Sequence, residues 1–305
     1  MPQSVASYTQ TWLEIHCCGL APATKRGYAS ALRLHILPLI GGRMLEDLTP
    51  ADILACLAPL CERGQTRAAQ LTLITLRAAL GDAQRLGLIS SNPAALVRAP
   101  RHERRPTPYW TPDQVGRFLR ATERDPLYPI WLLALCCGLR RGELLGLQWA
   151  DVDLRSAQVR ICRQRITIER QTLESAPKSA AGRRVLSLAP PVAASLASLR
   201  RRQPWAVYVL SHDAGGPYTA QQLRQALDAA TASAALPHIG VHGLRHSMAA
   251  AAVAAGVEMR TLQAILGHAH ISTTADIYAH VAPNVAADAL SRIASSVHDW
   301  KSCVR

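Results

Sequence analysis

Over residues 7–86, apolar residues recur every three or four positions, which is the spacing of one face of a helix. The pattern predicts a bundle of about four helices, at residues 7–16, 24–39, 49 onward and 66–86. The third helix has a clear start, because Thr49 fits the cap, Pro50 the first turn and Asp52 the positive end of the helix. Gly87 then closes the last helix of the bundle.

The pattern changes in the second half of the chain. Residues 128–137 form an apolar run that predicts a buried helix, and the segment QVRICRQRITI (158–168) alternates in part between β-branched and basic residues, as a half-buried strand does. The segment RRVLSL (183–188) fits a partner strand, with the turn at residues 179–182. Two helices follow at residues 190–202 and 219–235. We therefore expect a mainly α protein whose second domain contains a small antiparallel sheet.

A segment without an apolar period separates the two halves. Residues 98–108, RAPRHERRPTP, are rich in Arg and Pro, which is typical of a linker between domains. We expect a helical domain at residues 1–97, a basic linker at 98–108 and a second domain at 109–305. The linker is either a tether that lies along phosphates or a solvated hinge without contacts.

Charge indicates the partner. The 305 residues carry a net charge of +13, and arginine supplies nearly all of the positive charge. A guanidinium binds phosphate through a planar fork of donors, so this composition favours a nucleic acid as the polyanion that the protein meets. Ala and Leu dominate the apolar residues and there is one Phe, which favours helix over sheet.

The cysteines indicate a reducing compartment. The eight cysteines include two adjacent pairs and no CxxC or Cys/His metal spacing, so we expect reduced thiols, no metal and a cytoplasmic protein. No apolar run reaches the roughly 20 residues that a membrane span needs. The sequence also has no Gly-rich phosphate loop, so neither ATP nor another cofactor is expected.

The segment from 242 to 281 gathers the candidate chemistry. His242 and Arg245 are three residues apart and share a helix face, and Gly256 can end their helix. A short apolar helix then stops at Gly267, immediately before His268. Ser272 can cap a further helix that carries Tyr278, which suggests that these polar side chains form one pocket.

Four motifs in this chain resemble the tyrosine recombinases, the phage integrase family. They are HGLRH, LGHAHISTT and IYAHV within residues 242–281 and CGLRRGELLGLQWADVDL at residues 137–154, in the family's order. The resemblance runs from about Thr24 to Val281 and is that of a simple recombinase, Xer-like or a compact phage integrase. It implies a SAM-like core-binding domain that clamps DNA, followed by a catalytic domain of the DNA breaking-rejoining fold.

The resemblance implies six catalytic residues. They are Arg140, Lys178, His242, Arg245, His268 and Tyr278. Arg140 is favoured over Arg141 because the family places its arginine directly after Gly-x, and Glu143 lies near enough to hold it. The simpler alternatives are a structural ion pair for Arg140 and Glu143, a solvated lysine at a turn, and histidines that fill polar corners of the core.

This set of residue types suits one reaction. A tyrosine that attacks a DNA phosphate forms a 3′-phosphotyrosyl ester, which conserves the bond for rejoining by a 5′ hydroxyl. Arg140 and Arg245 would bind the non-bridging oxygens on which charge builds, together with His268. His242 would manage the tyrosine proton, and Lys178 would protonate the departing 5′ oxygen. No carboxylate cluster for magnesium ions accompanies them.

One position departs from the family pattern. Gly243 stands where the family is usually acidic, which removes a possible hydrogen-bond acceptor near Arg245. Beyond the tyrosine, residues 284–300 have the spacing of a helix, which in similar recombinases is exchanged with a neighbouring protomer.

The expected partners are double-stranded DNA and three further copies of the chain in a tetrameric synapse, with a directionality factor or a DNA-bending protein left open. The expected function is integration and excision, or resolution, of DNA molecules. Two rivals are a topoisomerase of type IB, which relaxes one DNA molecule without exchanging partners, and a DNA-binding regulator with a decayed catalytic domain.

Overall fold

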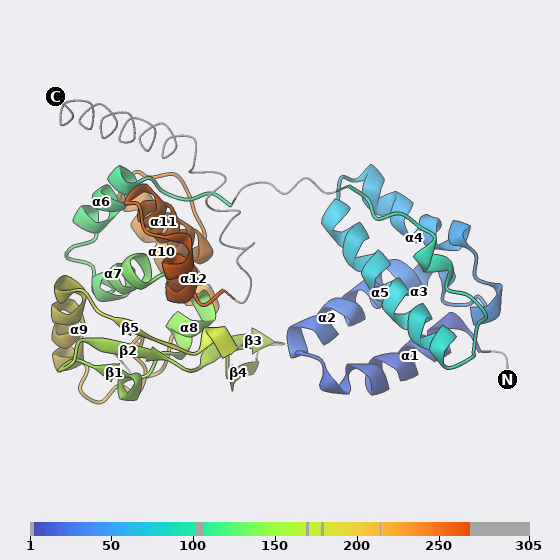
Figure 1. Cartoon of the computed structure of the whole chain (residues 1–305), viewed down its shortest axis with the longest axis horizontal. Coiled ribbons are helices and arrows are strands. Elements are labelled where there is room, and N and C mark those ends of the chain that lie inside the picture. Colours follow the sequence, from blue (N-terminus) through green and yellow to red (C-terminus); the bar gives the residue numbers. More distant parts are fainter. Residues whose placement is uncertain (1–2, 102–106, 169–170, 178–179, 214, 269–305) are drawn as a thin grey trace, which may run out of the picture. The chain divides into compact units, whose positions relative to one another are not determined.

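A computed structural model describes residues 3–101, 107–168, 171–177, 180–213 and 215–268 of the chain. The chain divides into two compact units, Met1–Arg105 and Pro106–Arg305, and Figure 1 draws the elements of each. The division falls within the segment that we expect to be a linker.

The first unit is a helical bundle, as the apolar spacing predicts. Its helices are α1 (Val5–Ile15), α2 (Pro22–Ala31), η2 (Leu32–Ile36), α3 (Leu37–Ile40), α4 (Pro50–Glu62) and α5 (Thr66–Arg85), with short 3-10 turns η1 (His16–Gly19), η3 (Leu45–Asp47) and η4 (Pro93–Ala95). Thr49 and Asp52 form the reciprocal cap that starts α4, which confirms that prediction. The apolar faces of these helices meet in one core.

The helix expected at residues 24–39 contains an irregularity. The five residues of η2 form a π-helical turn between α2 and α3, in which the Leu37 amide donates to the Leu32 carbonyl. Pro38 follows at the start of α3. Because proline lacks an N–H and crowds the preceding turn, the wider π turn accommodates it without ending the helix.

The second unit surrounds a larger core. Its helices are α6 (Pro112–Ala121), α7 (Tyr128–Cys137), α8 (Arg141–Gly146), α9 (Pro190–Arg202), α10 (Ala220–Ser233), α11 (Val241–Ala254) and α12 (Met259–Leu266). Trp110, Phe118 and Trp131 are fully buried in the core, with ring centroids 4.7 Å apart for the first pair and 6.1 Å apart for the second. None of the helices in the described ranges is long and apolar enough to cross a membrane.

The strands correct one prediction. The segment 158–168 does not form a single strand, because it breaks into β2 (Gln158–Ile161) and β3 (Gln164–Ile168). At the break, the Cys162 thiol and the Arg163 guanidinium both reach the carboxylate of Asp151, so the chain turns there. The two halves consequently belong to two different sheets.

Both sheets are antiparallel. One has the order β1-β2-β5, with β1 at Val152–Asp153 and β5 at Arg184–Ser187, and the pairing of β2 with β5 confirms the predicted partner strand. The other sheet pairs β3 with β4 (Gln171–Ser175), a strand that we did not predict. The 3-10 turn η6 (Ala180–Gly182) lies between β4 and β5.

Helix α11 is the central element of the second unit. It packs against α6, α7, α10 and α12 (Figure 1). The Ser247 hydroxyl on its buried side accepts a hydrogen bond from the Trp110 amide at 2.8 Å and donates to the Gly243 carbonyl at 2.8 Å. The two predicted helix ends are confirmed: Gly256 follows α11 and Gly267 follows α12, both in the left-handed conformation.

Candidate active site

The end of α7 places the first arginine. Gly138 ends α7 in the left-handed conformation, with φ of 61°, and Arg140 then caps the short helix α8. The Arg140 amide donates to one oxygen of Glu143 at 3.0 Å, and its guanidinium donates to the other at 2.7 Å. The Arg140 side chain keeps 34% of its surface exposed, so an incoming ligand can still reach it.

Glu143 is the only acidic group that this cluster uses within the described part of the chain. Its side chain is 1% exposed and also binds the guanidinium of Arg184, at 2.9 Å. Burial would raise the pKa of Glu143, but the hydrogen bonds and charge of Arg184, and then those of Arg140, outweigh it and hold the pKa below its ordinary value. Glu143 therefore stays ionised between two guanidinium groups.

Helix α11 places the second arginine. Arg245 is buried, and its two terminal nitrogens donate to the Gly138 carbonyl at 2.7 Å and the Leu266 carbonyl at 2.6 Å. Burial, followed by the charge of Arg140, lowers the pKa of Arg245 to about 9, so the side chain is charged at pH 7. Its direct hydrogen bonds within the described residues go to carbonyl groups, which do not neutralise it.

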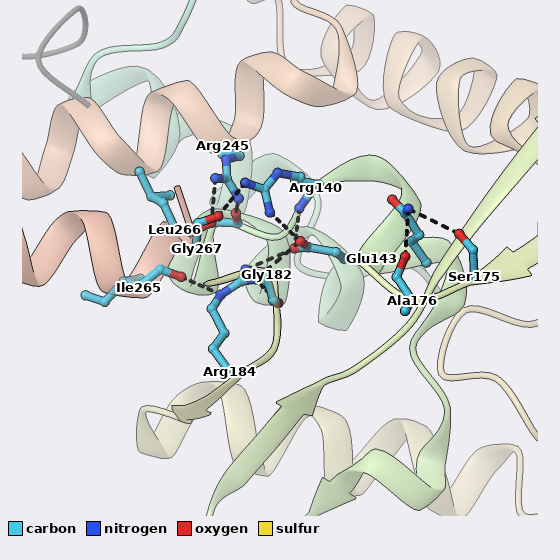
Figure 2. Close-up of polar contacts among 12 residues, drawn as sticks. Arg140, Glu143, Ser175, Ala176, Gly182, Arg184, Arg245, Ile265, Leu266 and Gly267 are labelled. Carbon is cyan, nitrogen blue, oxygen red and sulfur yellow. Dashed lines mark hydrogen bonds and ion pairs between the residues drawn. The ribbon is translucent and has the colours of Figure 1, made fainter. Parts of the chain in front are cut away.

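The end of α12 is where the two arginines meet. Arg140 donates to the Gly267 carbonyl at 2.7 Å, one residue after the Leu266 carbonyl that accepts from Arg245 (Figure 2). The last carbonyls of a helix have no partner within the helix and form its negative end, so cations bind there favourably. His268 follows Gly267 directly, and its ring is close enough to feel the charges of Arg245 and Arg140.

Both candidate histidines are near these charges. Burial, then the charges of Arg245 and Arg140, lower the pKa of His268 to about 4. Burial, the neighbouring ring of His246 and then the charges of Arg245 and Arg140 lower the pKa of His242 to about 4. His242 is nevertheless an exposed residue, so water screens part of this effect. Both rings are neutral at pH 7 and can accept a proton.

Four of the six predicted residues therefore come together around one point. Arg140, Arg245, His242 and His268 belong to α8, α11 and the turn after α12. Lys178 and Tyr278 lie outside the described residues, as do the helix expected to carry Tyr278 and the C-terminal helix expected at residues 284–300.

The cluster carries an excess of positive charge. In the described structure, the guanidinium groups of Arg140 and Arg184 share the carboxylate of Glu143, and Arg245 binds backbone carbonyls only. Three positive charges and one negative charge leave a net excess of two positive charges. A site of this kind favours an anion with several oxygens, such as a phosphate diester.

Comparison with known proteins decides the family. The phage integrase family model matches residues 108–284, more than half of the chain, and the model of the phage integrase central domain matches residues 5–100. Tyrosine recombinase XerC of Alcanivorax borkumensis is 30% identical over 276 residues, which cover 86% of this chain and 84% of that protein. This chain belongs to the phage integrase family. It is a site-specific tyrosine recombinase.

A second relative agrees with this assignment, and a solved structure has the same fold. The recombinase is 29% identical over 205 residues to a XerC-like tyrosine recombinase of Caldanaerobacter subterraneus subsp. tengcongensis, and the match covers 59% of this chain and about half, 52%, of that protein. Its fold matches the Tn1549 transposon integrase, solved in complex with transposon right end DNA, with a TM-score of 0.82 and 21% identity. That match covers 96% of this chain and 100% of the other.

Gly243 has a packing role in the recombinase. A Cβ atom at this position would lie 2.8 Å from Ile239 and 2.9 Å from the Pro108 carbonyl oxygen. An acidic side chain therefore does not fit here without displacing the backbone. Backbone carbonyls serve as the acceptors for Arg245 instead.

Two further residues of the site escaped the sequence analysis. Arg184 binds Glu143, and His246 packs its ring edge-on against His242 with centroids 4.7 Å apart. His246 stands one turn after His242 on α11, so its contact was predictable from helical spacing. Arg184 carried no such signal, because its partners lie on α8 and at the end of α12.

Proposed function

We propose that this recombinase cuts and rejoins double-stranded DNA at specific sites through a 3′-phosphotyrosyl intermediate, with Tyr278 as the nucleophile. The observation that carries the proposal is the meeting of Arg140 and Arg245 at the end of α12, next to His268. That arrangement suits one scissile phosphate, and its uncompensated positive charge favours the phosphorane-like transition state.

Each described residue then has a chemical task. Arg140 and Arg245 donate to the non-bridging oxygens, and His268 donates to the same phosphate. The neutral ring of His242 takes the phenol proton as the Tyr278 oxygen bonds to phosphorus. The bond from phosphorus to the 5′ oxygen breaks, and Lys178 gives that oxygen its proton. Attack by a 5′ hydroxyl on the phosphotyrosyl ester reverses these steps and rejoins a strand.

The remaining parts of the chain supply DNA binding and assembly. We assign residues 1–97 to a DNA-clamping domain joined by a basic linker, residues 98–108, to the catalytic domain at 109–305. The net charge of +13 supports contact with the phosphate backbone. Four copies are expected on two DNA sites, since a recombinase must exchange four strands between two duplexes. The expected compartment is the cytoplasm, which contains the DNA.

A suicide substrate tests the proposal. When a duplex is nicked close to the cleavage site, cleavage releases the short fragment that carries the freed 5′ hydroxyl. No hydroxyl then remains to rejoin the strand, so the protein stays joined to the DNA. We expect an SDS-resistant protein–DNA species in buffer that contains EDTA and no ATP, because arginine and lysine side chains replace metal ions in this mechanism. If every such species requires a divalent metal, the proposed mechanism is wrong.

Two further substrates, a pair of different duplexes and a supercoiled plasmid, separate this function from its two rivals. Joining of two different duplexes identifies a recombinase, whereas relaxation of one supercoiled plasmid without exchange identifies a topoisomerase. DNA binding without any covalent species would identify a regulator.

A further inference from the structure

Arg184 is an arginine with a largely buried side chain that donates four hydrogen bonds to the protein itself. It is the first residue of β5, and its side chain is 7% exposed. The guanidinium donates to both oxygens of Glu143, at 3.2 Å and 2.9 Å. It also donates to the Ile265 carbonyl at 2.7 Å and to the Gly182 carbonyl at 3.1 Å. A guanidinium held on four sides in this way has little capacity to bind a substrate as well.

Glu143 connects Arg184 to a candidate catalytic group. The Glu143 oxygen that accepts from the Arg184 terminal nitrogen at 3.2 Å also accepts from the Arg140 guanidinium at 2.7 Å. The other oxygen accepts from the Arg140 amide. Since a carboxylate between two fixed guanidinium groups has one favourable orientation, Arg184 restricts the position of Glu143 and thereby that of Arg140.

Arg184 also holds the turn that carries His268. Three consecutive carbonyls at the end of α12, those of Ile265, Leu266 and Gly267, each accept from a different arginine (Figure 2). Arg184 takes the first, and Arg245 and Arg140 take the other two. Its side chain also packs on Gly267, where a Cβ atom would come within 3.0 Å of an Arg184 terminal nitrogen.

We propose that Arg184 is a positioning residue of the recombinase, which fixes Arg140 through Glu143 and fixes the His268 turn through the Ile265 carbonyl before DNA binds. The inference rests on the proposed function, because it assigns those two groups to the scissile phosphate. It places Arg184 outside contact with DNA and predicts an effect on the cleavage rate of bound DNA, with little effect on DNA binding.

Three variants distinguish positioning from charge. Arg184→Gln removes both the charge and the fork. Arg184→Lys keeps the charge near Glu143, but a single ammonium cannot reproduce planar donation to both oxygens and to the Ile265 carbonyl. Arg183→Gln is the matched control, since Arg183 is the preceding residue, is exposed and loses the same unit of charge.

The measurement is single-turnover cleavage of a suicide substrate at saturating DNA, with the DNA dissociation constant measured separately. We expect the rate constant to fall by about 100-fold in Arg184→Gln, because a displacement of about 1 Å in a catalytic group has an effect of that size. For Arg184→Lys, the rate constant should fall by at least about 10-fold, while the final yield of adduct should equal that of the wild type. Both should bind DNA as Arg183→Gln does, and Arg183→Gln should cleave at the wild-type rate.

The yield of adduct separates positioning from simple misfolding. A variant that is only partly folded gives less adduct at an unchanged rate constant, whereas a mispositioned site gives full yield slowly. If Arg184→Gln does not fold, Arg184→Lys alone decides. Cleavage by Arg184→Lys at the wild-type rate overturns the inference.

A double-mutant cycle tests the path through Glu143. In a Glu143→Gln background, Arg184→Gln should reduce the rate by much less than it does in the wild type, because the shared carboxylate is already lost. Fully additive effects would contradict the path. If the wild type itself forms no adduct, the proposed function fails. If the wild type cleaves and Arg184→Lys cleaves at the same rate, this inference fails alone.

Discussion

At the scale of residues, the site is organised by how arginines are paired. Arg245 is buried and charged, yet its hydrogen bonds to described residues end on two backbone carbonyls. Holding a cation in this way is unfavourable until an anion arrives, which suits a group that must stabilise charge in a transition state. Glu143 offsets part of the positive charge through its ion pairs with Arg140 and Arg184, and leaves an excess that favours a phosphate.

Replacement of Arg245 by lysine tests this pairing. Arg245→Lys cannot reach the Gly138 and Leu266 carbonyls together and present a fork to phosphate. We expect the single-turnover cleavage rate to fall by about 100-fold to 1,000-fold, the effect of losing one donor from a transition-state site.

The control for this substitution is Arg141→Lys, since Arg141 is exposed and adjacent to Arg140. It should cleave within about twofold of the wild type, as surface substitutions outside a site commonly do. A comparable loss in both variants would argue against the assignment of Arg245.

The histidines predict a dependence on pH. The pKa values of His242 and His268 are lowered to about 4, so both rings remain neutral well below the ordinary value of 6.5. The unfolded chain takes up protons at these positions as the pH falls below 6.5, and the folded chain does not. The contribution of these two histidines to the free energy of unfolding is therefore fully present above pH 6.5, and it is lost as the pH falls toward 4.

NMR measurement of the histidine resonances checks directly whether the pKa values of His242 and His268 are lowered. Between pH 7.5 and pH 5, the His242 and His268 ring signals should stay at the neutral position, assigned through His242→Asn and His268→Asn. Titration of either ring with a midpoint near 6.5 would show that burial and the neighbouring arginines do not lower its pKa.

At the scale of elements, the helix boundaries and the pairing of β2 with β5 were predictable, but the break between β2 and β3 was not. Thr49 with Pro50, and Gly267 after an apolar stripe, mark helix ends through local rules, and the structure confirms both. The break between β2 and β3 involves Asp151, which lies outside the segment 158–168, so no pattern within that segment predicts it.

Some features of the active site could likewise be predicted from the sequence, and others could not. The helical spacing of His242 and Arg245 could be inferred from the sequence, whereas the role of Arg184 could not. Its contacts with Glu143 and Ile265 span 41 and 81 positions of the chain, and such contacts follow from the fold alone.

The turn after α12 allows a matched test at this scale. Gly267 and Gly256 both have positive φ, of 63° and 77°, but a Cβ at Gly267 would lie 2.7 Å from the Ala181 carbonyl oxygen, while Gly256 faces open space. Gly256→Ala should lower the free energy of unfolding by about 1–2 kcal/mol, from backbone strain alone. Gly267→Ala should lower it by a further 1–3 kcal/mol or so, from overpacking.

Of the two substitutions, only Gly267→Ala should also slow cleavage of bound DNA, because it displaces the turn that carries His268. Chemical denaturation and single-turnover cleavage measure the two effects. Equal behaviour of the two alanine variants would mean that the turn is not held tightly.

At the scale of the whole molecule, a recombinase must coordinate several copies of one active site. The helix expected at residues 284–300 is our candidate for the contact between neighbours. Truncation after Pro283 should weaken assembly of several protomers on paired DNA sites by at least about 10-fold, while binding of one protomer to a half-site changes little. Sedimentation measures the assembly of several protomers, and gel-shift titration measures the binding of one protomer to a half-site. An equal loss of both would mean that the segment packs within its own protomer.

The most direct test identifies the atom joined to DNA. After cleavage of a suicide substrate in EDTA, proteolysis and mass spectrometry should find the nucleotide on the peptide that contains Tyr278, and Tyr278→Phe should bind the same DNA without forming an adduct. An adduct on any other residue, or an undiminished adduct in Tyr278→Phe, would contradict the mechanism.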